Sequence, residues 1–79
     1  MSENTIILVN AKGLKCPMPV IKLQQQVRKS QAGDTIQISC TDPGAQKDIA
    51  SWVRVNKHQW LEHITTDYGC DIKIIVKPK

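Results

Sequence analysis

The sequence predicts a two-layer α/β (α+β) sandwich, in which a four-stranded mixed sheet carries two helices on one face. Two segments alternate apolar and polar residues with the period of a strand, and two others repeat apolar residues with the period of a helix. The segments follow one another in the order β-α-β-α-β-β. The 79 residues suffice for a single domain, residues 1–79, with one modest core. Packing both helices on one side of the sheet is the simplest way to build that core.

The first strand is predicted at residues 6–9. Four consecutive apolar residues there indicate that both faces are covered, which is typical of a strand in the interior of a sheet. A helix is predicted to follow over residues 19–30. Val20, Leu23 and Val27 lie at positions i, i+3 and i+7 and form one apolar stripe.

The second strand is predicted at residues 34–41, because Ile36, Ile38 and Cys40 alternate with polar residues. This alternation indicates one covered face and places Cys40 in the core. We therefore expect Cys40 to be structural, since buried apolar cysteines are normally unreactive.

The second helix is predicted to begin around Asp42 and Pro43 and to end near Asn56. The Asp42 carboxylate is suited to capping the free N–H groups of the first turn, and Pro43 suits the first helical position. The apolar stripe of this helix consists of Ala45, Ile49, Trp52 and Val53.

Two further strands are predicted at residues 58–66 and 70–76, joined by a turn at residues 67–69. We expect them to form an antiparallel hairpin, with Ile72 and Ile74 on its covered face. The opposite face of the sheet is then open to solvent or to a partner. Its candidate residues are Gln37, Ser39, Thr41, Lys73, Ile75 and Lys77.

Composition and charge narrow the classes of function. The sequence has no basic start with a long apolar run and no segment of membrane-spanning length, so we expect a cytoplasmic protein without membrane contact. The net charge of +4 is spread along the chain without a continuous basic run, which is weak support for nucleic-acid binding. The three cysteines match no common zinc spacing. We therefore expect free thiols, no metal site and no cofactor.

The candidate reactive group is the thiol of Cys16, in the Cys-Pro-Met-Pro segment at residues 16–19. Pro19 suits the first turn of a helix, so Cys16 is expected just before a helix N-terminus, where the helix dipole favours the thiolate. Lys12 and Lys15 add positive charge nearby, and together these features predict a lowered pKa. The alternative is that Cys16 is a small buried hydrophobe, as most free cysteines are.

The residues around Cys16 are expected to hold the thiol in a rigid frame. Pro17 and Pro19 restrict the backbone at low entropic cost, and Gly13 is the expected flexible point of the preceding loop. A thiolate that is already formed needs no general base, so no further catalytic residue is expected.

The segment around Cys16 resembles the Gly-Leu-x-Cys-Pro-x-Pro signature of the TusA-like (SirA-like) sulfur-carrier proteins, because residues 13–20 read Gly-Leu-Lys-Cys-Pro-Met-Pro-Val. The Asp42-Pro43 step resembles the family's Asp-Pro helix start, and His58 resembles its third landmark. There are departures as well, such as Asn10 where the family often has aspartate. The resemblance implies a two-layer α/β sandwich similar to the C-terminal domain of translation initiation factor 3.

The resemblance also implies a sulfurtransferase-type function. In this family the cysteine of the signature, here Cys16, accepts a sulfur atom as a persulfide and passes it on. The implied partners are a cysteine desulfurase or another persulfide donor, and a downstream acceptor protein. The implied pathways include 2-thiolation of tRNA uridine and maturation of the molybdenum cofactor. We expect a monomer, since a carrier must expose Cys16 to successive partners.

Two other classes of function remain open from the sequence. The first is a non-catalytic regulatory or interaction module, which would present the open face of the sheet to a partner. The second is a small RNA-binding domain, suggested by the positive charge and by the implied fold. Fold likeness alone is a poor guide to function, so the sulfur-carrier hypothesis is the one we follow.

Overall fold

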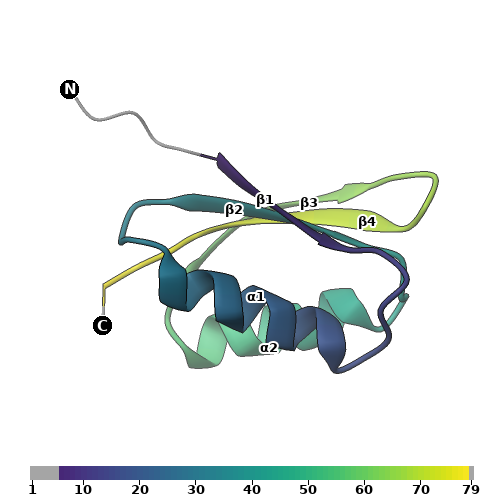
Figure 1. Cartoon of the computed structure of the whole chain (residues 1–79), viewed down its shortest axis with the longest axis horizontal. Helices are drawn as coiled ribbons and strands as arrows, with labels where there is room; N and C mark the ends of the chain where they lie inside the picture. Colours follow the sequence, from purple (N-terminus) through teal and green to yellow (C-terminus); the bar gives the residue numbers. More distant parts are fainter. Residues whose placement is uncertain (1–5, 79) are drawn as a thin grey trace.

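The computed structural model describes residues 6–78 and has the predicted order of elements (Figure 1). The four strands form one mixed sheet in the order β1-β2-β4-β3. Both helices lie on the same side of this sheet, which confirms the two-layer architecture. The elements are β1 (Ile6–Ala11), α1 (Met18–Lys29), β2 (Thr35–Cys40), α2 (Ala45–Val55), β3 (Gln59–Thr65) and β4 (Cys70–Ile75).

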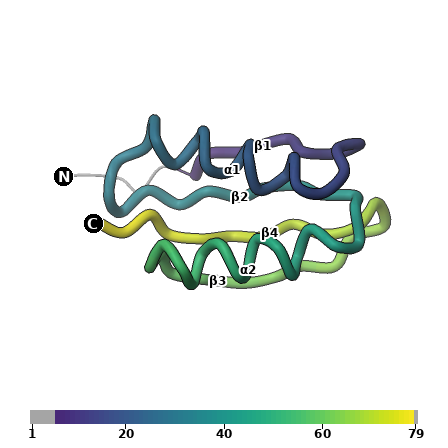
Figure 2. The backbone as a smooth tube through the Cα atoms, turned by 90° about the horizontal axis from the view of Figure 1, so that it is seen from below, coloured from purple at the N-terminus to yellow at the C-terminus, as the bar shows by residue number. Residues whose placement is uncertain are grey.

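The sheet combines parallel and antiparallel pairing. Strand β1 runs parallel to β2, whereas β4 runs antiparallel to both β2 and β3. Helix α1 covers the β1–β2 half of the sheet and α2 covers the β4–β3 half, as Figure 2 shows from the helical side. The predicted final hairpin is therefore confirmed.

The core lies between the sheet and the two helices. Strands β2 and β4 are central and contribute one covered face each, because their alternate side chains point toward the helices. Aliphatic side chains from α1 and α2 close this layer. The largest fully buried side chains are Leu23, Ile36, Ile38, Ile49, Ile72, Ile74, Pro19 and Cys40.

The prediction that the first strand lies in the interior of the sheet is wrong. Strand β1 is an edge strand that pairs only with β2. Val9 and Ala11 are buried, but Ile6 is 53% exposed and Leu8 is 74% exposed. The run of four apolar residues indicated two covered faces, whereas the sheet has helices on one face only. The side chains of Ile6 and Leu8 therefore remain on the uncovered face.

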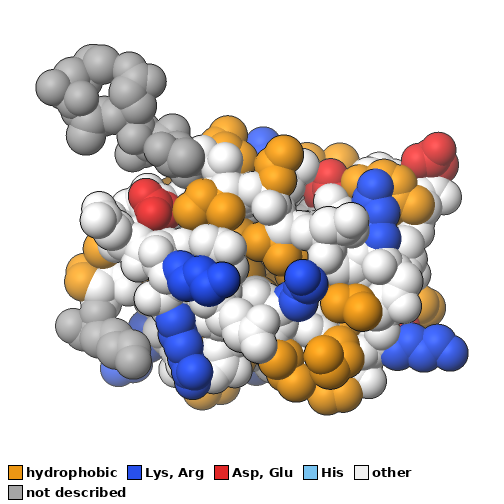
Figure 3. All heavy atoms as spheres, viewed as in Figure 1, with side chains coloured by type: hydrophobic (Ala, Val, Ile, Leu, Met, Phe, Trp, Pro, Cys, Tyr) orange, Lys and Arg blue, Asp and Glu red, His pale blue; other side chains and the backbone are white. Residues whose placement is uncertain are grey.

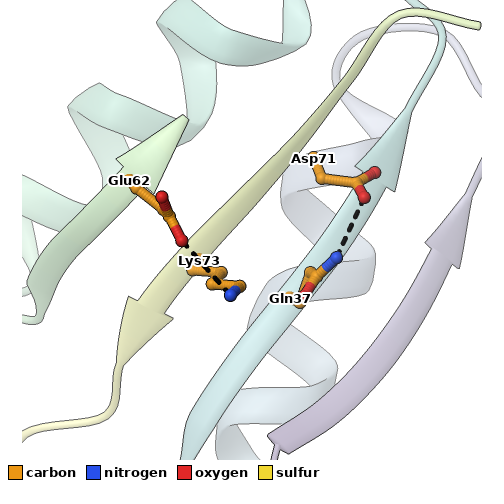
Figure 4. Close-up of polar contacts among 4 residues, drawn as sticks. All are labelled: Gln37, Glu62, Asp71 and Lys73. Atoms are coloured by element: carbon orange, nitrogen blue, oxygen red, sulfur yellow. Dashed lines mark hydrogen bonds and ion pairs between the residues drawn. The ribbon is translucent and has the colours of Figure 1, made fainter. Parts of the chain in front are cut away.

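The open face of the sheet carries a polar network centred on Asp71. Gln37 donates a hydrogen bond from Nε2 to Asp71 Oδ2 at 2.9 Å, and Lys73 forms an ion pair with Glu62 at 3.2 Å (Figure 4). Tyr68 donates its hydroxyl to Asp71 Oδ1 at 2.6 Å. Burial opposes the charge of Asp71, but the hydrogen bonds outweigh it and lower the pKa of this carboxyl. Gln37 and Lys73 thus lie on the face where they were predicted.

Candidate functional site

The loop between β1 and α1 meets the loop between β2 and α2 at one end of the sheet, where both strands terminate. Neighbouring parallel strands have their carboxyl ends on the same side, and the last residues of β1 and β2, Ala11 and Cys40, pair with each other. The segments that follow these strands therefore start side by side. This topology brings Cys16, in the first loop, close to residues that lie about thirty positions further along the chain.

The thiol of Cys16 is exposed, so its interpretation as a buried hydrophobe is wrong. Helix α1 starts at Met18, with Pro17 at the N-cap and Pro19 in the first turn, which confirms that the thiol lies just before a helix N-terminus. Pro19 itself is buried and anchors this end of the helix against the core. Gly13 has a positive φ of 81°, a conformation that glycine adopts readily, and it lies in the loop predicted there.

Two hydrogen bonds tie the Cys16 loop to the segment between β2 and α2. The Gly13 N–H donates to Thr41 Oγ1 at 2.9 Å, and the Cys16 N–H donates to Asp42 Oδ2 at 2.7 Å. The second oxygen of Asp42, Oδ1, accepts the Gly44 N–H at 3.2 Å. The N–H groups of Cys16 and Gly44, together with the charge of Lys15, lower the pKa of Asp42. Asp42 is therefore a carboxylate that clamps the thiol-bearing loop.

The predicted capping role of Asp42 is replaced by this clamp. The N-cap of α2 is Gly44, and the N-cap position makes no side-chain capping hydrogen bond. Helix α2 begins at Ala45, after Pro43, so Pro43 lies before the helix rather than at its first position. One oxygen of Asp42 still binds the Gly44 N–H, but the other is directed at the loop that carries Cys16.

The Sγ of Cys16 donates a hydrogen bond to Oδ2 of Asp48, in the first turn of α2. This bond raises the pKa of Cys16, as do desolvation and the negative charges of Asp48 and Asp42. The predicted lowering of the pKa is therefore wrong. Two carboxylates close to the thiol outweigh the dipole of α1, whose effect falls off within about one turn of the helix N-terminus. The sequence shows Asp48 as an ordinary first-turn acid, 32 positions away from Cys16.

The two lysines expected to support the thiolate have other neighbours. The Nζ of Lys12 lies 4.2 Å from the centroid of the Tyr68 ring, a cation–π contact, and its charge helps to lower the pKa of Asp71. Lys15 acts on Asp42 instead. Lysine and arginine side chains are scattered over the face shown in Figure 3 rather than gathered into one basic patch.

A shallow hollow of about 400 Å³ lies beside the thiol. It opens where the Cys16 loop meets the β2–α2 junction, and both segments line it. Among residues 6–78, no group of three or more His, Cys, Asp or Glu side chains is placed to hold a metal ion. The lining residues are Gly13, Leu14, Lys15, Cys16, Thr41, Asp42 and Pro43.

The other two cysteines are buried and do not line this hollow. Cys40 and Cys70 are buried and face one another in the antiparallel register of β2 and β4. Burial is the main cause that raises the pKa of Cys40 to about 12, and burial also raises the pKa of Cys70. The predicted place of Cys40 in the core is confirmed.

Comparison with known proteins identifies the family. The family model described as sulfurtransferase TusA matches residues 7–77. The chain belongs to the TusA family. The sulfur carrier protein TusA of Pseudomonas putida (strain KT2440) is 36% identical over 55 residues, which is 70% of this chain and 69% of that protein. The family resemblance deduced from residues 13–20 is thereby confirmed.

Two other relatives, each described as a putative sulfur carrier protein, differ in length. YrkI of Bacillus subtilis (strain 168) is 31% identical over 70 residues, covering 89% of this chain and 91% of that protein. YrkF of the same organism is 38% identical over 61 residues, but the match spans only 32% of YrkF and 77% of this chain.

The solved SirA-like protein from Desulfitobacterium hafniense has the same fold. Its TM-score is 0.79 at 20% identity, covering 94% of this chain and all of that one.

Proposed function

We propose that this protein is a sulfur carrier that receives a sulfur atom on Cys16 as a persulfide and delivers it to an acceptor protein. The observation that carries the proposal is the exposure of Cys16, which is the one exposed thiol of the three in the chain. The TusA-family match and the adjoining hollow support it. A carrier thiol must be reached by two different partners in turn, and Cys16 lies in a loop open to both.

The transfer balances without any oxidant or cofactor. The Cys16 sulfur forms a bond to the outer sulfur of a donor persulfide, and the S–S bond of the donor breaks. The donor leaves as a thiol, and the carrier is left with the persulfide Cys16–S–SH. In delivery, an acceptor thiol attacks the outer sulfur and Cys16 returns to its thiol form. The overall exchange moves one sulfur atom and leaves the proton count unchanged.

The proposed partners follow from this chemistry. The donor is a cysteine desulfurase or another protein that presents a persulfide, and the acceptor is a thiol-bearing protein of a route such as tRNA thiolation or molybdenum-cofactor maturation. We propose that the carrier acts in the cytoplasm as a monomer. In the part of the chain that the structure describes, no helix is long and apolar enough to cross a membrane.

Intact-protein mass spectrometry tests the proposal. The protein is incubated with a cysteine desulfurase and cysteine, without reductant. We expect a gain of one sulfur atom that reductant reverses and that Cys16→Ser abolishes. Cys70→Ala, which removes a buried thiol, is the matched control and is expected to gain sulfur normally. An accessible Cys16 that gains no sulfur from this donor or from a small persulfide would contradict the proposal and favour the interaction-module hypothesis.

A further inference from the structure

We infer that Asp48 is a second catalytic residue of the site: its carboxylate takes the proton of the Cys16 thiol as the sulfur attacks, and passes it to the departing thiol. This inference rests on the proposed sulfur transfer. It assigns a proton acceptor to a reaction for which the sequence indicated none. It also explains why a half-buried carboxylate from α2 lies against the reacting sulfur.

The need for a proton acceptor follows from the surroundings of Cys16. The nucleophile in sulfur exchange is the thiolate, and an ordinary cysteine is only a few per cent thiolate at pH 7. Here the pKa is raised further, so the resting group is a protonated thiol. The thiol must therefore lose its proton during the attack. A general base has to lie within hydrogen-bonding reach of that proton, and Oδ2 of Asp48 does.

The second nearby carboxylate is already committed to another task. Both oxygens of Asp42 accept backbone N–H groups, from Cys16 and from Gly44. These bonds and Lys15 stabilise its negative charge and make it a poor proton acceptor. The two carboxylates near the thiol therefore have different roles. Asp42, with Lys15 beside it, holds the loop, and Asp48 contacts the sulfur itself.

The proton follows a closed path through both half-reactions. In uptake, the proton moves from Sγ of Cys16 to Asp48 Oδ2 while the new S–S bond forms, and then to the sulfur that leaves the donor. In delivery, Asp48 takes the proton of the acceptor thiol and returns it to Sγ of Cys16. The carboxylate is regenerated after each step. No electrons are gained or lost beyond the exchange of one S–S bond for another.

Two reactions of Cys16 separate this role from a mere effect on the pKa. Alkylation by iodoacetamide needs the thiolate, but its iodide leaving group takes no proton. Sulfur uptake from glutathione persulfide also needs the thiolate, and in the inferred path the departing thiolate receives its proton from Asp48. In Asp48→Asn, the negative charge beside the thiol is lost and the carboxylate is replaced by an amide, whose oxygen is a weaker hydrogen-bond acceptor, so the pH profile of alkylation shifts to lower pH. Alkylation at pH 7 then becomes several-fold faster than in the wild type.

Sulfur uptake by Asp48→Asn is expected to change in the opposite direction. General acid–base catalysis typically contributes about 10²-fold or more, so the single-turnover uptake rate at pH 7 should fall by about that factor. Asp48→Glu keeps a carboxylate and is expected to stay within roughly tenfold of the wild type. Asp34→Asn, which changes a carboxylate at the opposite end of β2, is the matched control and should leave both rates unchanged. Circular dichroism establishes that each variant is folded.

The outcomes distinguish the inference from the proposed function. If the wild type takes up sulfur on Cys16 and Asp48→Asn takes it up as fast or faster, the inference is wrong and the proposed function stands. Asp48→Glu losing as much uptake as Asp48→Asn would also overturn it. If the wild type takes up no sulfur from glutathione persulfide or from a desulfurase, the proposed function fails first.

Discussion

The thiols of Cys16, Cys40 and Cys70 all have a raised pKa, but they differ in access, because Cys16 is exposed and the other two are buried. Cys40 lies in the core among isoleucine side chains, and its burial raises its pKa to about 12. The pKa of Cys16 is also raised, but the first cause is a hydrogen bond to a carboxylate at an exposed surface. In the proposed carrier, a raised pKa therefore does not mark a thiol as inert. What separates the two regions is whether a partner can reach the sulfur and whether a proton acceptor lies beside it.

The largest expected difference between the two regions is in alkylation of the native protein. Iodoacetamide should modify Cys16 on the order of 10³-fold faster than Cys40 or Cys70, because the buried thiols react only after opening of the core. Mass spectrometry of peptides after timed quenching measures the three rates. In urea the rates should become similar. Comparable labelling of Cys40 in the native protein would show that burial does not protect its thiol.

The buried pair should lose its protection if the hairpin next to it is displaced. A Cβ at Gly69 would lie 2.2 Å from the carbonyl oxygen of Cys40, and its φ of 151° is rarely adopted by other residues. We expect Gly69→Ala to lower the free energy of unfolding by about 3 kcal/mol or more and to speed alkylation of Cys40. Urea denaturation measures the first effect.

Gly33→Ala is the control for this substitution. Gly33 also has a positive φ, of 98°, but an added Cβ meets nothing within 4 Å. It should cost only about 1–2 kcal/mol, the backbone penalty alone. Equal losses in the two variants would show that the close approach of Gly69 to Cys40 does not matter.

Alkaline pH should weaken the protein through the buried thiols. The pKa of Cys40 is near 9 when exposed and about 12 in the fold, so the folded state binds its proton more tightly. The stability from this difference is fully present below pH 9 and is lost as the pH rises from about 9 to 12. Between pH 8 and 10 we expect a loss of roughly 1 kcal/mol in the free energy of unfolding.

Cys40→Ala should reduce this pH dependence, because the titrating group is gone. Urea denaturation at both pH values for the wild type and the variant gives the difference. An identical slope in the two proteins would show that Cys40 does not contribute to it.

The smallest expected effect concerns the loop clamp. Asp42→Asn keeps an oxygen that can accept the Cys16 N–H but removes one of the charges that raise the pKa of Cys16. Alkylation of Cys16 at pH 7 should become faster by less than about threefold, a smaller change than in Asp48→Asn, because Asp48 is the larger cause. A larger effect of Asp42→Asn than of Asp48→Asn would show that Asp42, and not Asp48, is the main cause of the raised pKa of Cys16.

Local patterns were sufficient for most of the elements of the fold. Helix α1 begins within one residue of its predicted start because Pro19 and the Val20, Leu23 and Val27 stripe are local signals. The placement of Cys40 in the core followed from alternation in one strand. The interior position of the first strand was wrong, because four apolar residues do not reveal how many faces of a sheet are covered.

The sequence by itself determined the order of elements, the aliphatic core and the Cys-Pro-Met-Pro loop, since each depends on residues close together in the chain. The tertiary structure decided that β1 is an edge strand, that Asp42 accepts the backbone N–H of Cys16 and that Asp48 accepts the hydrogen bond of its thiol. Asp42 and Asp48 reach Cys16 only because the parallel strands β1 and β2 have their carboxyl ends at the same end of the sheet. That meeting joins residues 26 and 32 positions apart, and the charges that set the thiol's pKa act through space rather than along the chain.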